Sequence, residues 1–470
     1  MEHYNIIFAI IATAMYLIVA KYDIHMFQLS SYRYSRYFRW LVPANIFSFK
    51  RRVALLACAS ALLPDFYGLG LLSGVTIVAA THALREKFKT PLVYTMRVKR
   101  LFATNILLFA AIAAAAVIFG SSHAPIIIGA AIVLSNLIML LANLINTPIE
   151  KAINRHYYND AKKIIRSHKG LIIIGVTGSF GKTSTKNYLA SLLAEKYNVL
   201  VTPGNFNTLL GVVRTVREQL RPYHQVFIVE MGAKQPNDIK EICDLVQPTI
   251  GIVTAVGEMH LETFKCVENI QKTKFELIDS LPPDGLGVIN FDSQPIRDYK
   301  GTTSRCRVLR YAVEQKADFC ATDIIYNGSG VSFTQGADRF ESRLLGRGNL
   351  LNILASIAVA DHLGVPRTKQ KNAIARLQPV EHRLSMSRRG GLTILDDAYN
   401  SNLMGAQMAL EVLKNFSVGE GNKRIIVTPG FVEMGSRQAE ANKELGRYIA
   451  SCADYAIVVN ATNRAAISSG

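Results

Sequence analysis

Long apolar runs dominate the first third of the chain and cover residues 4–20, 53–84, 101–119 and 124–146. A helix needs about 20 apolar residues to cross the hydrocarbon core of a bilayer, and most of these runs approach that length. Within 53–84, Pro64-Asp65 predicts a turn between two short or tilted helices, which form either a hairpin or a re-entrant segment. The pattern therefore predicts an α-helical transmembrane domain of about five helices over residues 1–146.

The positive charges between the apolar runs predict the orientation of this domain. Lys and Arg are concentrated in residues 21–52 and 85–100, whereas residues 120–123 contain neither. Because positively charged loops stay on the cytoplasmic side, we expect both basic segments and everything after Asn146 in the cytoplasm. The opening residues lack the basic stretch and the small-residue cleavage site of a signal peptide, so we expect the first apolar run to be retained.

Two segments beside the apolar runs carry aromatic or amphipathic patterns. Residues 26–42 interleave Tyr, Phe and Trp40 with arginines. Such aromatics can stack on RNA bases, but next to a membrane span we favour an interfacial belt that contacts anionic membrane lipids, and we expect no nucleic acid partner. Residues 147–169 form an amphipathic connector, with apolar side chains at helical spacing at Ile149, Ile153, Tyr157, Ala161 and Ile164.

From Leu171 onward the pattern changes to short β runs that alternate with helical stretches. Strands separated by helices predict a parallel sheet, so we expect a doubly wound α/β central domain over residues 170–346. After a helical junction at 347–378, the runs LTILDDAY, KRIIVTPG and DYAIVVN predict a Rossmann-like α/β domain over 379–470. It stops after these three runs, so we expect the C-terminal domain to be incomplete.

Composition agrees with a membrane-bound, multidomain chain. The 470 residues exceed one ordinary domain, and the net charge is +18. The first 150 residues hold 13 Lys and Arg against 5 Asp and Glu, so much of the positive excess lies beside the apolar runs, where an anionic membrane face would attract it. The six cysteines lack metal-ligand spacing and are expected to be reduced thiols.

The sharpest chemical signal is the glycine-rich segment GVTGSFGKTS (175–184), which lies between an apolar strand and a helical stretch. Strand, turn and helix N-terminus together point backbone N–H groups at phosphate oxygens. Lys182 would neutralise the β and γ phosphates, and Thr183 would bind Mg²⁺. The strict GxxxxGK[ST] pattern needs a glycine where this chain has Val176. The residues assigned to phosphate binding are Gly178, Gly181, Lys182, Thr183 and Ser184.

The TGxxGKTS spacing resembles the phosphate loop of the Mur ligase family, the ATP-dependent amide-bond ligases of peptidoglycan precursor synthesis. The resemblance spans residues 150–470 and includes, in family order, TPGNFNTLLG (202–211), FIVEMGA (227–233), TAVGEMHLETF (254–264), QKTKFEL (271–277), GVINFDS (287–293), GRGNLLNILASIAVADHLG (346–364), EHRLSM (381–386), LDDAYNSN (395–402) and TPGFVEMG (428–435). The last two segments resemble one branch of the family in particular.

The resemblance also implies roles for individual residues. It implies catalytic roles for Lys182, His260 and Lys274, and metal ligation by Thr183, Glu230 and His260. Nucleotide contacts are implied for Asn290, Arg383 and Asp397. Substrate contacts are implied for Asn205, Asn207 and Asn400. Lys274 matches a lysine that CO₂ converts to a carbamate, whereas by itself it reads as an exposed helix lysine. Glu230 also ends a predicted strand, where ligands bind in open α/β sheets, and carboxylate oxygens suit Mg²⁺.

The implied activity is ATP-dependent formation of an amide bond in peptidoglycan or cell-envelope precursor synthesis. ATP would convert a carboxylate to an acyl phosphate, which the amine of an amino acid or short peptide then attacks. The implied location is a bacterial inner membrane, with multiple spans and cytoplasmic catalytic domains.

The chain departs from the family pattern in two places. The soluble domain that holds the UDP-sugar in cytosolic members is not recognisable, and the membrane third stands in its place, which favours a lipid-linked envelope precursor over a UDP-linked one. Gly348 also replaces a family histidine at the start of a helix that contains Asn349 and Asn352.

Two other classes of function remain open. Several spans and a phosphate loop also suit an ATP-driven transporter, but no LSGGQ-like segment follows the loop and the spans carry few charges. The other is a scaffold that binds ATP and recruits envelope enzymes without ligase activity.

Overall fold

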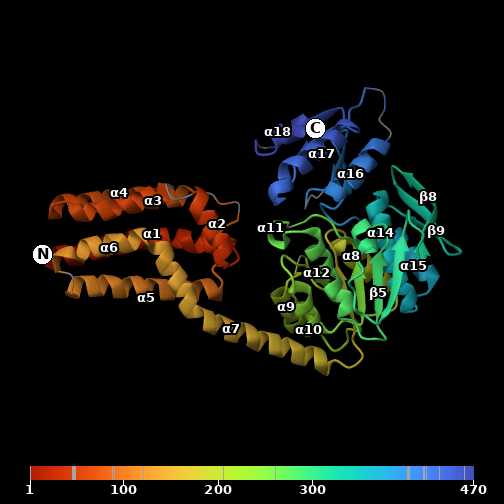
Figure 1. Cartoon of the computed structure of the whole chain (residues 1–470), viewed down its shortest axis with the longest axis horizontal. Helices are drawn as coiled ribbons and strands as arrows, with labels where there is room; N and C mark the ends of the chain where they lie inside the picture. The colour runs from red at the N-terminus through yellow and green to blue at the C-terminus, as the bar shows by residue number, and fades with distance from the viewer. Residues whose placement is uncertain are drawn as a thin grey trace. The chain divides into compact units, whose positions relative to one another are not determined.

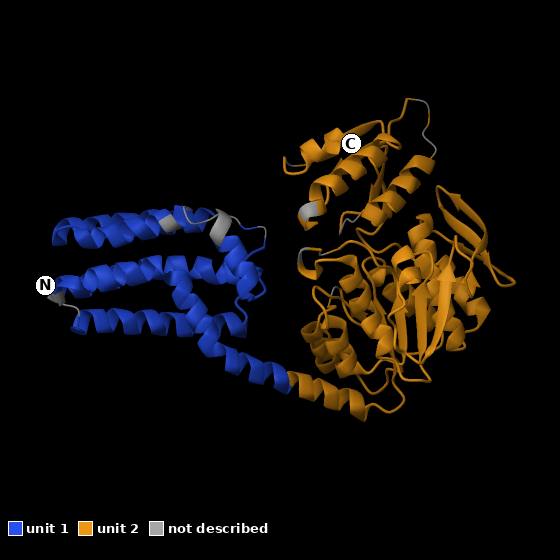
Figure 2. Cartoon of the chain, in the orientation of Figure 1, with its two compact units in different colours: residues 1–156 blue, residues 157–470 orange. Residues whose placement is uncertain are grey.

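The computed structural model describes residues 2–44, 49–86, 88, 90–119, 121–204, 206–259, 261–399, 403–416, 419, 421–432, 434–459 and 461–470. The chain divides into two compact units, residues 1–156 and 157–470 (Figure 2). Each unit is described by itself.

The first unit is helical (Figure 1). Its elements are α1 (Glu2–Leu29), α2 (Tyr34–Ala44), α3 (Phe49–Ala59), the 3-10 turn η1 (Ser60–Leu62), α4 (Asp65–Arg85), α5 (Met96–Phe119), η2 (Ser121–His123), α6 (Ala124–Val133) and the first part of α7 (Ser135–Ser167). Among the described residues, α1, α4 and α5 are long and apolar enough to cross a membrane. Helices α6 and α7, bent by 74°, meet the same criterion as a pair. The described helices thus offer three or four spans, against the five predicted.

The run 53–84 forms two helices that pack against each other, α3 and α4. Pro64 directly precedes α4, where Pro64-Asp65 predicted a turn. Helix α3 has 11 residues; at 1.5 Å per residue it is roughly 16 Å long, about half the hydrocarbon thickness. Its length agrees with a short or re-entrant limb.

Hydrogen bonds between buried polar side chains join α1 to the other helices of this unit. Asp23 of α1 accepts hydrogen bonds from Ser135 at 2.6 Å and from Tyr37 at 3.4 Å. Tyr16 donates to Asn105 of α5 at 2.7 Å. Because an apolar environment offers these groups no alternative partner, the contacts fix how the helices pack.

Helix α7 continues from the last apolar run through the expected connector, 147–169, with Pro148 inside it. In its C-terminal part, Ala161 and Ile165 are buried in an apolar cluster of the second unit. Ile164 also packs against this cluster, whereas Ile149 and Tyr157 are exposed, so only the C-terminal part of the predicted apolar side is covered.

A seven-stranded parallel sheet forms the centre of the second unit, in the order β2-β3-β1-β4-β5-β6-β7. Its strands are β1 (Ile172–Thr177), β2 (Val199–Val201), β3 (Val226–Met231), β4 (Ile250–Val253), β5 (Leu286–Asn290), β6 (Arg307–Ala312) and β7 (Phe319–Cys320). The predicted central parallel sheet is confirmed. The order places β1 and the loop that follows it between β3 and β4.

Helices cover both faces of the sheet, as expected for a doubly wound domain. One apolar cluster contains side chains of α8 (Lys182–Leu193), α14 (Gly346–His362) and α15 (Arg367–Ala375). The other contains side chains of α9 (Leu209–Gln219), α10 (Asp238–Val246) and α12 (Val267–Asp279). The segment 347–378, expected to be a junction, thus contributes α14 and α15 to the core of the central domain.

Smaller elements complete this domain. A three-stranded antiparallel sheet consists of β8 (Thr322–Asn327), β9 (Gly330–Gln335) and β10 (Asp338–Ser342). Two short helices, α11 (Leu261–Phe264) and α13 (Gln294–Asp298), lie in the connections that follow β4 and β5.

The C-terminal residues form two small sheets and three helices. The elements are β11 (Ser385–Arg389), β12 (Leu392–Asp396), α16 (Leu403–Asn415), β13 (Ile425–Thr428), the 3-10 turn η3 (Gly435–Arg437), α17 (Gln438–Ala450), β14 (Tyr455–Val458) and α18 (Arg464–Ser469). Strands β13 and β14 pair in parallel, as predicted. The run LTILDDAY was expected in the same sheet, but its strand β12 pairs antiparallel with β11. Gly390 and Gly391, both at positive φ, supply the tight turn that closes this hairpin.

Candidate functional site

The glycine-rich segment forms the turn between β1 and the N-terminus of α8. Gly178 and Gly181 have φ angles of 154° and 81°. A Cβ at Gly178 would lie 2.0 Å from Oγ1 of Thr254, and one at Gly181 would lie 2.6 Å from Oδ1 of Asn352. Both positions therefore need glycine for backbone shape and for space. The turn leaves the first N–H groups of α8 available to an anion.

Lys182, the first residue of α8, folds back onto this turn. Its Nζ donates hydrogen bonds to the carbonyl oxygens of Gly178 at 2.7 Å and Ser179 at 3.3 Å. Burial lowers the pKa of Lys182 to about 8; Arg383 adds to this effect, while Glu230 opposes it. The side chain remains mostly charged at neutral pH and lies where phosphate oxygens would arrive.

Glu230 lies near the carboxyl end of β3 and is 1% exposed. Its Oε1 accepts a hydrogen bond from Nδ2 of Asn207 at 3.1 Å. Its Oε2 lies 3.1 Å from Nζ of Lys186 but accepts no hydrogen bond from any residue that the structure describes. A buried carboxylate oxygen without a donor is suited to a hard cation, so Glu230 fits the expected metal ligand.

The rest of a metal site would have to come from other oxygen atoms. In the described part of the chain there is no group of three or more His, Cys, Asp or Glu side chains that could hold a metal ion. Mg²⁺ commonly binds through one or two protein oxygens plus water and phosphate. Glu230 offers one such oxygen, and Thr183, at the start of α8, lines the neighbouring pocket.

Lys186 is a functional candidate that the sequence analysis missed. It lies one turn after Lys182 on α8, is 2% exposed, and donates hydrogen bonds to the carbonyl oxygens of Thr202 and Gly204 at 2.8 and 2.9 Å. A charged residue on the buried face of a helix is rare without a partner. The spacing of four residues from Lys182, on the face that meets the sheet, was the available signal.

Lys274 is buried on α12 with 4% of its surface exposed. Burial, together with the nearby charge of Lys182, lowers its pKa to about 7, while Glu276 and Asp238 oppose the shift. Its amine is therefore largely neutral just above neutral pH. A neutral amine is the form that reacts with CO₂, so the environment is compatible with a carbamate.

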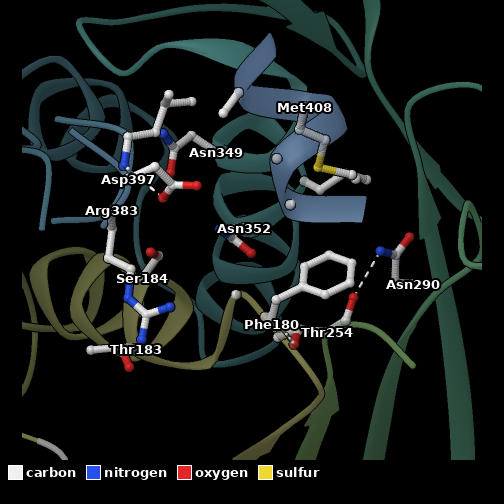
Figure 3. Close-up of a pocket in the computed structure, with 16 residues that line it drawn as sticks. Phe180, Thr183, Ser184, Thr254, Asn290, Asn349, Asn352, Arg383, Asp397 and Met408 are labelled. Carbon is white, nitrogen blue, oxygen red and sulfur yellow. Dashed lines mark hydrogen bonds between the residues drawn. The ribbon is translucent and has the colours of Figure 1, made fainter. Parts of the chain in front are cut away.

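A pocket extends from the phosphate loop to the C-terminal domain (Figure 3). Its lining comes from the phosphate loop, the ends of β4 and β5, α14, the segment 383–397 and α16, and comprises Phe180, Gly181, Thr183, Ser184, Thr254, Asn290, Gly348, Asn349, Leu351, Asn352, Arg383, Leu384, Asp397, Gly405, Met408 and Ala409. In the view of Figure 3, Thr183, Ser184 and Arg383 lie at one end, and Asn290 and Met408 at the other. Asn290 donates to the carbonyl oxygen of Thr254 at 2.8 Å.

Two charged side chains reach this pocket from the C-terminal domain. The guanidinium carbon of Arg383 lies 4.1 Å from the ring centroid of Tyr399. Oδ1 of Asp397 accepts a hydrogen bond from the backbone N–H of Leu384 at 3.1 Å. Burial raises the pKa of Asp397 to about 6; Asp396 adds to this, while the Leu384 N–H and Arg383 oppose it. The structure thus brings both residues to the phosphate loop.

Gly348, the position where the family resemblance implies a histidine, lies against Met408 of α16. A Cβ at Gly348 would be 3.1 Å from the Met408 sulfur, so a larger side chain would displace α16 or the methionine. The neighbouring Asn349 accepts a hydrogen bond from Tyr188 at 2.8 Å, and Asn352 accepts one from Thr185 at 3.0 Å. These contacts tie α14 to α8, directly behind the phosphate loop.

Three of the predicted site residues, Asn205, His260 and Asn400, lie outside the described residues. The remaining ones fall into two neighbouring groups. Those that line the pocket are Gly181, Thr183, Ser184, Asn290, Arg383 and Asp397, and those outside its lining are Gly178, Lys182, Asn207, Glu230 and Lys274.

Comparison with known proteins identifies the central domain. Residues 176–360 match the family model of the Mur ligase middle domain. Among relatives named UDP-N-acetylmuramoyl-tripeptide–D-alanyl-D-alanine ligase, the protein of Buchnera aphidicola is 30% identical over 281 residues, which cover 58% of this chain and 61% of the relative. The protein of Bacillus subtilis is 29% identical over 283 residues, 60% of each chain. That of Mycobacterium bovis is 35% identical over 251 residues, 52% of this chain and 49% of the relative.

Solved structures give the same result. MurF from Acinetobacter baumannii superposes with a TM-score of 0.62 at 25% identity, covering 67% of this chain and 69% of that one. MurF ligase from Thermotoga maritima, in complex with ADP, superposes with a TM-score of 0.60 at 28% identity, covering 67% and 72%. The resemblance to the Mur ligase family is therefore confirmed, in the branch suggested by LDDAYNSN and TPGFVEMG. This chain nonetheless spans only 61% and 60% of the length of the Buchnera and Bacillus relatives.

Proposed function

We propose that this chain, whose residues 176–360 form a Mur ligase middle domain, is a membrane-anchored ATP-dependent ligase that joins a carboxylate to the amine of an amino acid or peptide. The observation that supports this most is the pocket itself. It combines the phosphate loop with Arg383 and Asp397 from the C-terminal domain, as a nucleotide site between two domains requires. The proposed setting is peptidoglycan or cell-envelope precursor synthesis.

In the first chemical step, a carboxylate oxygen of the acid attacks the γ phosphorus of ATP, the bond to the β-phosphate oxygen breaks, and ADP leaves. Lys182 and the N-terminus of α8 neutralise charge on the phosphates. Arg383 approaches the same region from the C-terminal domain. Mg²⁺, when bound at Glu230 and Thr183, would supply further neutralisation. The protein contributes position and charge, and needs no nucleophilic side chain.

In the second step, the amine attacks the acyl carbon, phosphate leaves, and the nitrogen loses a proton. Negative charge develops on the acyl oxygen, and the cations already in place stabilise it. The buried Lys274 lies on α12 beside this edge of the sheet, and we propose that it acts as a carbamate. Its largely neutral amine supports this assignment.

We further propose that the first unit anchors the enzyme in a bacterial inner membrane, with the catalytic domains in the cytoplasm. Helices α1, α4 and α5 have the length and apolar character of spans. The acid is proposed to be an envelope precursor, either lipid-linked or UDP-linked, and the membrane unit favours the lipid-linked form. The related ligases are named for a UDP-linked tripeptide and D-alanyl-D-alanine, which makes these the first substrates to compare.

The proposal is tested with the full chain purified in detergent. ATP is supplied with each candidate acid, lipid-linked or UDP-linked, and with D-alanyl-D-alanine or single amino acids. The expected result is phosphate release that requires both acceptors, together with a new amide found by mass spectrometry. Nucleotide binding without acceptor-dependent phosphate release would instead identify an ATP-binding scaffold. The Lys182→Ala variant serves as the inactive control.

A further inference from the structure

Lys186 places a second buried ammonium group beside the phosphate loop. Its Nζ donates to the carbonyl oxygens of Thr202 and Gly204 and lies 3.1 Å from Oε2 of Glu230. An ammonium group has three protons, and these three oxygens surround it. Lys186 therefore connects α8, the loop after β2 and the end of β3 through one side chain.

Lys186 forms an ion pair with Glu230, which also interacts electrostatically with Lys182 and Arg383. Both side chains are 2% exposed, and in a buried site the attraction between charges is several times stronger than in water. Asn207 donates a hydrogen bond to Oε1, but it carries no charge. Among the described residues, Oε2 faces Lys186 and accepts no hydrogen bond. A divalent cation that approaches Oε2 must therefore compete with the ammonium group.

The same ammonium group also holds the loop that carries the proposed substrate residues. Thr202 and Gly204 directly precede Asn205, and Asn207 follows on the same loop. The hydroxyl of Thr202 in addition accepts a hydrogen bond from the backbone N–H of Glu230 at 3.0 Å. The loop and the carboxylate are thus bound to one another and to Lys186.

Resting on the proposed function, we propose that Lys186 is a positioning residue that competes with the divalent cation for Glu230 and holds the 202–207 loop for the substrate. The two roles have opposite consequences. Without the ammonium group, the cation should bind Glu230 more tightly. The loop should lose its anchor, so the acid substrate should bind more weakly. If the lysine had only a structural role, its loss would weaken the binding of both the cation and the acid substrate.

The test compares Mn²⁺ binding to the nucleotide-free full chain, wild type against Lys186→Met, by electron paramagnetic resonance at a fixed pH of about 8. Methionine keeps the length of the side chain without its charge. The dissociation constant for Mn²⁺ is expected to fall by roughly threefold to tenfold. In turnover assays, the KM for the acid is expected to rise by at least about fivefold, with the KM for ATP within about twofold. An unchanged or higher Mn²⁺ dissociation constant would overturn the proposal.

Two variants serve as matched controls. Lys196 also donates to two carbonyl oxygens, those of Leu363 and Gly364 at 2.9 and 3.0 Å, but it lies in the turn that follows the C-terminal end of α8. Lys196→Met should leave Mn²⁺ binding unchanged. Asn207→Ala removes an uncharged donor from the same carboxylate and should not tighten the binding. If either control tightens Mn²⁺ binding as much as Lys186→Met, competition by the Lys186 charge is wrong.

If Lys186→Met folds poorly, Lys186→Gln carries the same prediction for Mn²⁺ affinity, because an amide removes the charge while it can still donate to the loop. Mn²⁺ affinity is measured without turnover, so it separates this proposal from the proposed function. Wild-type protein that binds Mn²⁺ but forms no amide would overturn the ligase assignment alone. An active ligase whose Mn²⁺ affinity is the same with and without the Lys186 substitution would overturn only the proposed role of this residue.

Discussion

Two lysines at the site, the buried Lys274 and the partly buried Lys182, predict how the ligase reaction depends on pH. Lys274 must be neutral to take up CO₂, and burial lowers its pKa to about 7. Lys182 must be protonated to neutralise phosphate, and burial lowers its pKa to about 8. Activity is therefore lost as the pH falls below the pKa of Lys274 and as it rises above the pKa of Lys182. A plot of kcat/KM for ATP against pH should therefore be bell-shaped, with its maximum between the two pKa values.

The size of the effect follows from the two pKa values. The form with a neutral Lys274 and a protonated Lys182 makes up roughly 60% of the free enzyme near pH 7.5, and roughly 9% near pH 6 or pH 9. We therefore expect about a sixfold loss of kcat/KM at either end. Bound ATP favours the charged form of Lys182. The pKa that limits kcat on the alkaline side should therefore rise by at least about one pH unit, which corresponds to about 1.4 kcal/mol of interaction between Lys182 and ATP.

The assay follows phosphate release at constant ionic strength and constant dissolved CO₂. A parallel measurement with ¹³C-bicarbonate should detect a carbamate signal that the Lys274→Arg variant lacks. Lys272 is exposed on the same helix, so Lys272→Ala is the control. Its kcat/KM should fall at low and at high pH as in the wild type. A profile that is flat across this range, or full activity in Lys274→Arg, would refute the reasoning about these lysines.

Three further predictions test the site and the topology. Lys182→Ala should lower kcat by about 10² to 10³ while the thermal unfolding midpoint stays close to that of the wild type, because the variant removes a buried charge aimed at phosphate; near-normal phosphate release would contradict the ATP site. In intact cells with native cysteines replaced, a cysteine at Ser122 should react with an impermeant maleimide and one at Thr95 should not, as measured by gel shift; the reverse would invert the topology. Gly178→Ala should weaken ADP binding by at least about tenfold in calorimetry, since its Cβ would collide with Thr254, and unchanged affinity would show that the loop can adjust.

The sequence predicted those parts of the fold that depend on local pattern. Alternating apolar strands and helices predicted the central parallel sheet, and the glycines predicted the turn before α8. Pro64-Asp65 predicted the break between α3 and α4. Each of these features is determined by residues that are neighbours in the chain, so the pattern alone contains the information.

Features that depend on packing between distant segments were not predictable in this way. Helix α14 was expected in a junction because it lies between two sets of β runs, but its apolar side chains are buried against the sheet and α8. The hairpin of β11 and β12 replaced an expected parallel strand, because Gly390 and Gly391 close a tight turn. The sequence contained the turn residues, but the alternating α/β pattern around them favoured the other interpretation.

At the site, too, contacts between charged residues that are far apart in the sequence could not be predicted. Lys182 and Glu230 are recognisable from motifs, whereas the pairing of Glu230 with Lys186 depends on the order of strands, which places β3 beside β1. Because β3 adjoins β1, a carboxylate at the end of β3 reaches the helix that follows β1. A lysine one turn into that helix then meets the carboxylate, and the only local signal of this contact is its spacing of four residues from Lys182.

The position of Lys182 links this charge arrangement to nucleotide binding. Its ammonium group donates hydrogen bonds to the carbonyl oxygens of Gly178 and Ser179, which belong to the loop that would receive phosphate. Phosphate oxygens are charged and form stronger hydrogen bonds to an ammonium group than carbonyl oxygens do. ATP should therefore draw Lys182 off the loop, and the carbonyl contacts hold the charge close to its target until then.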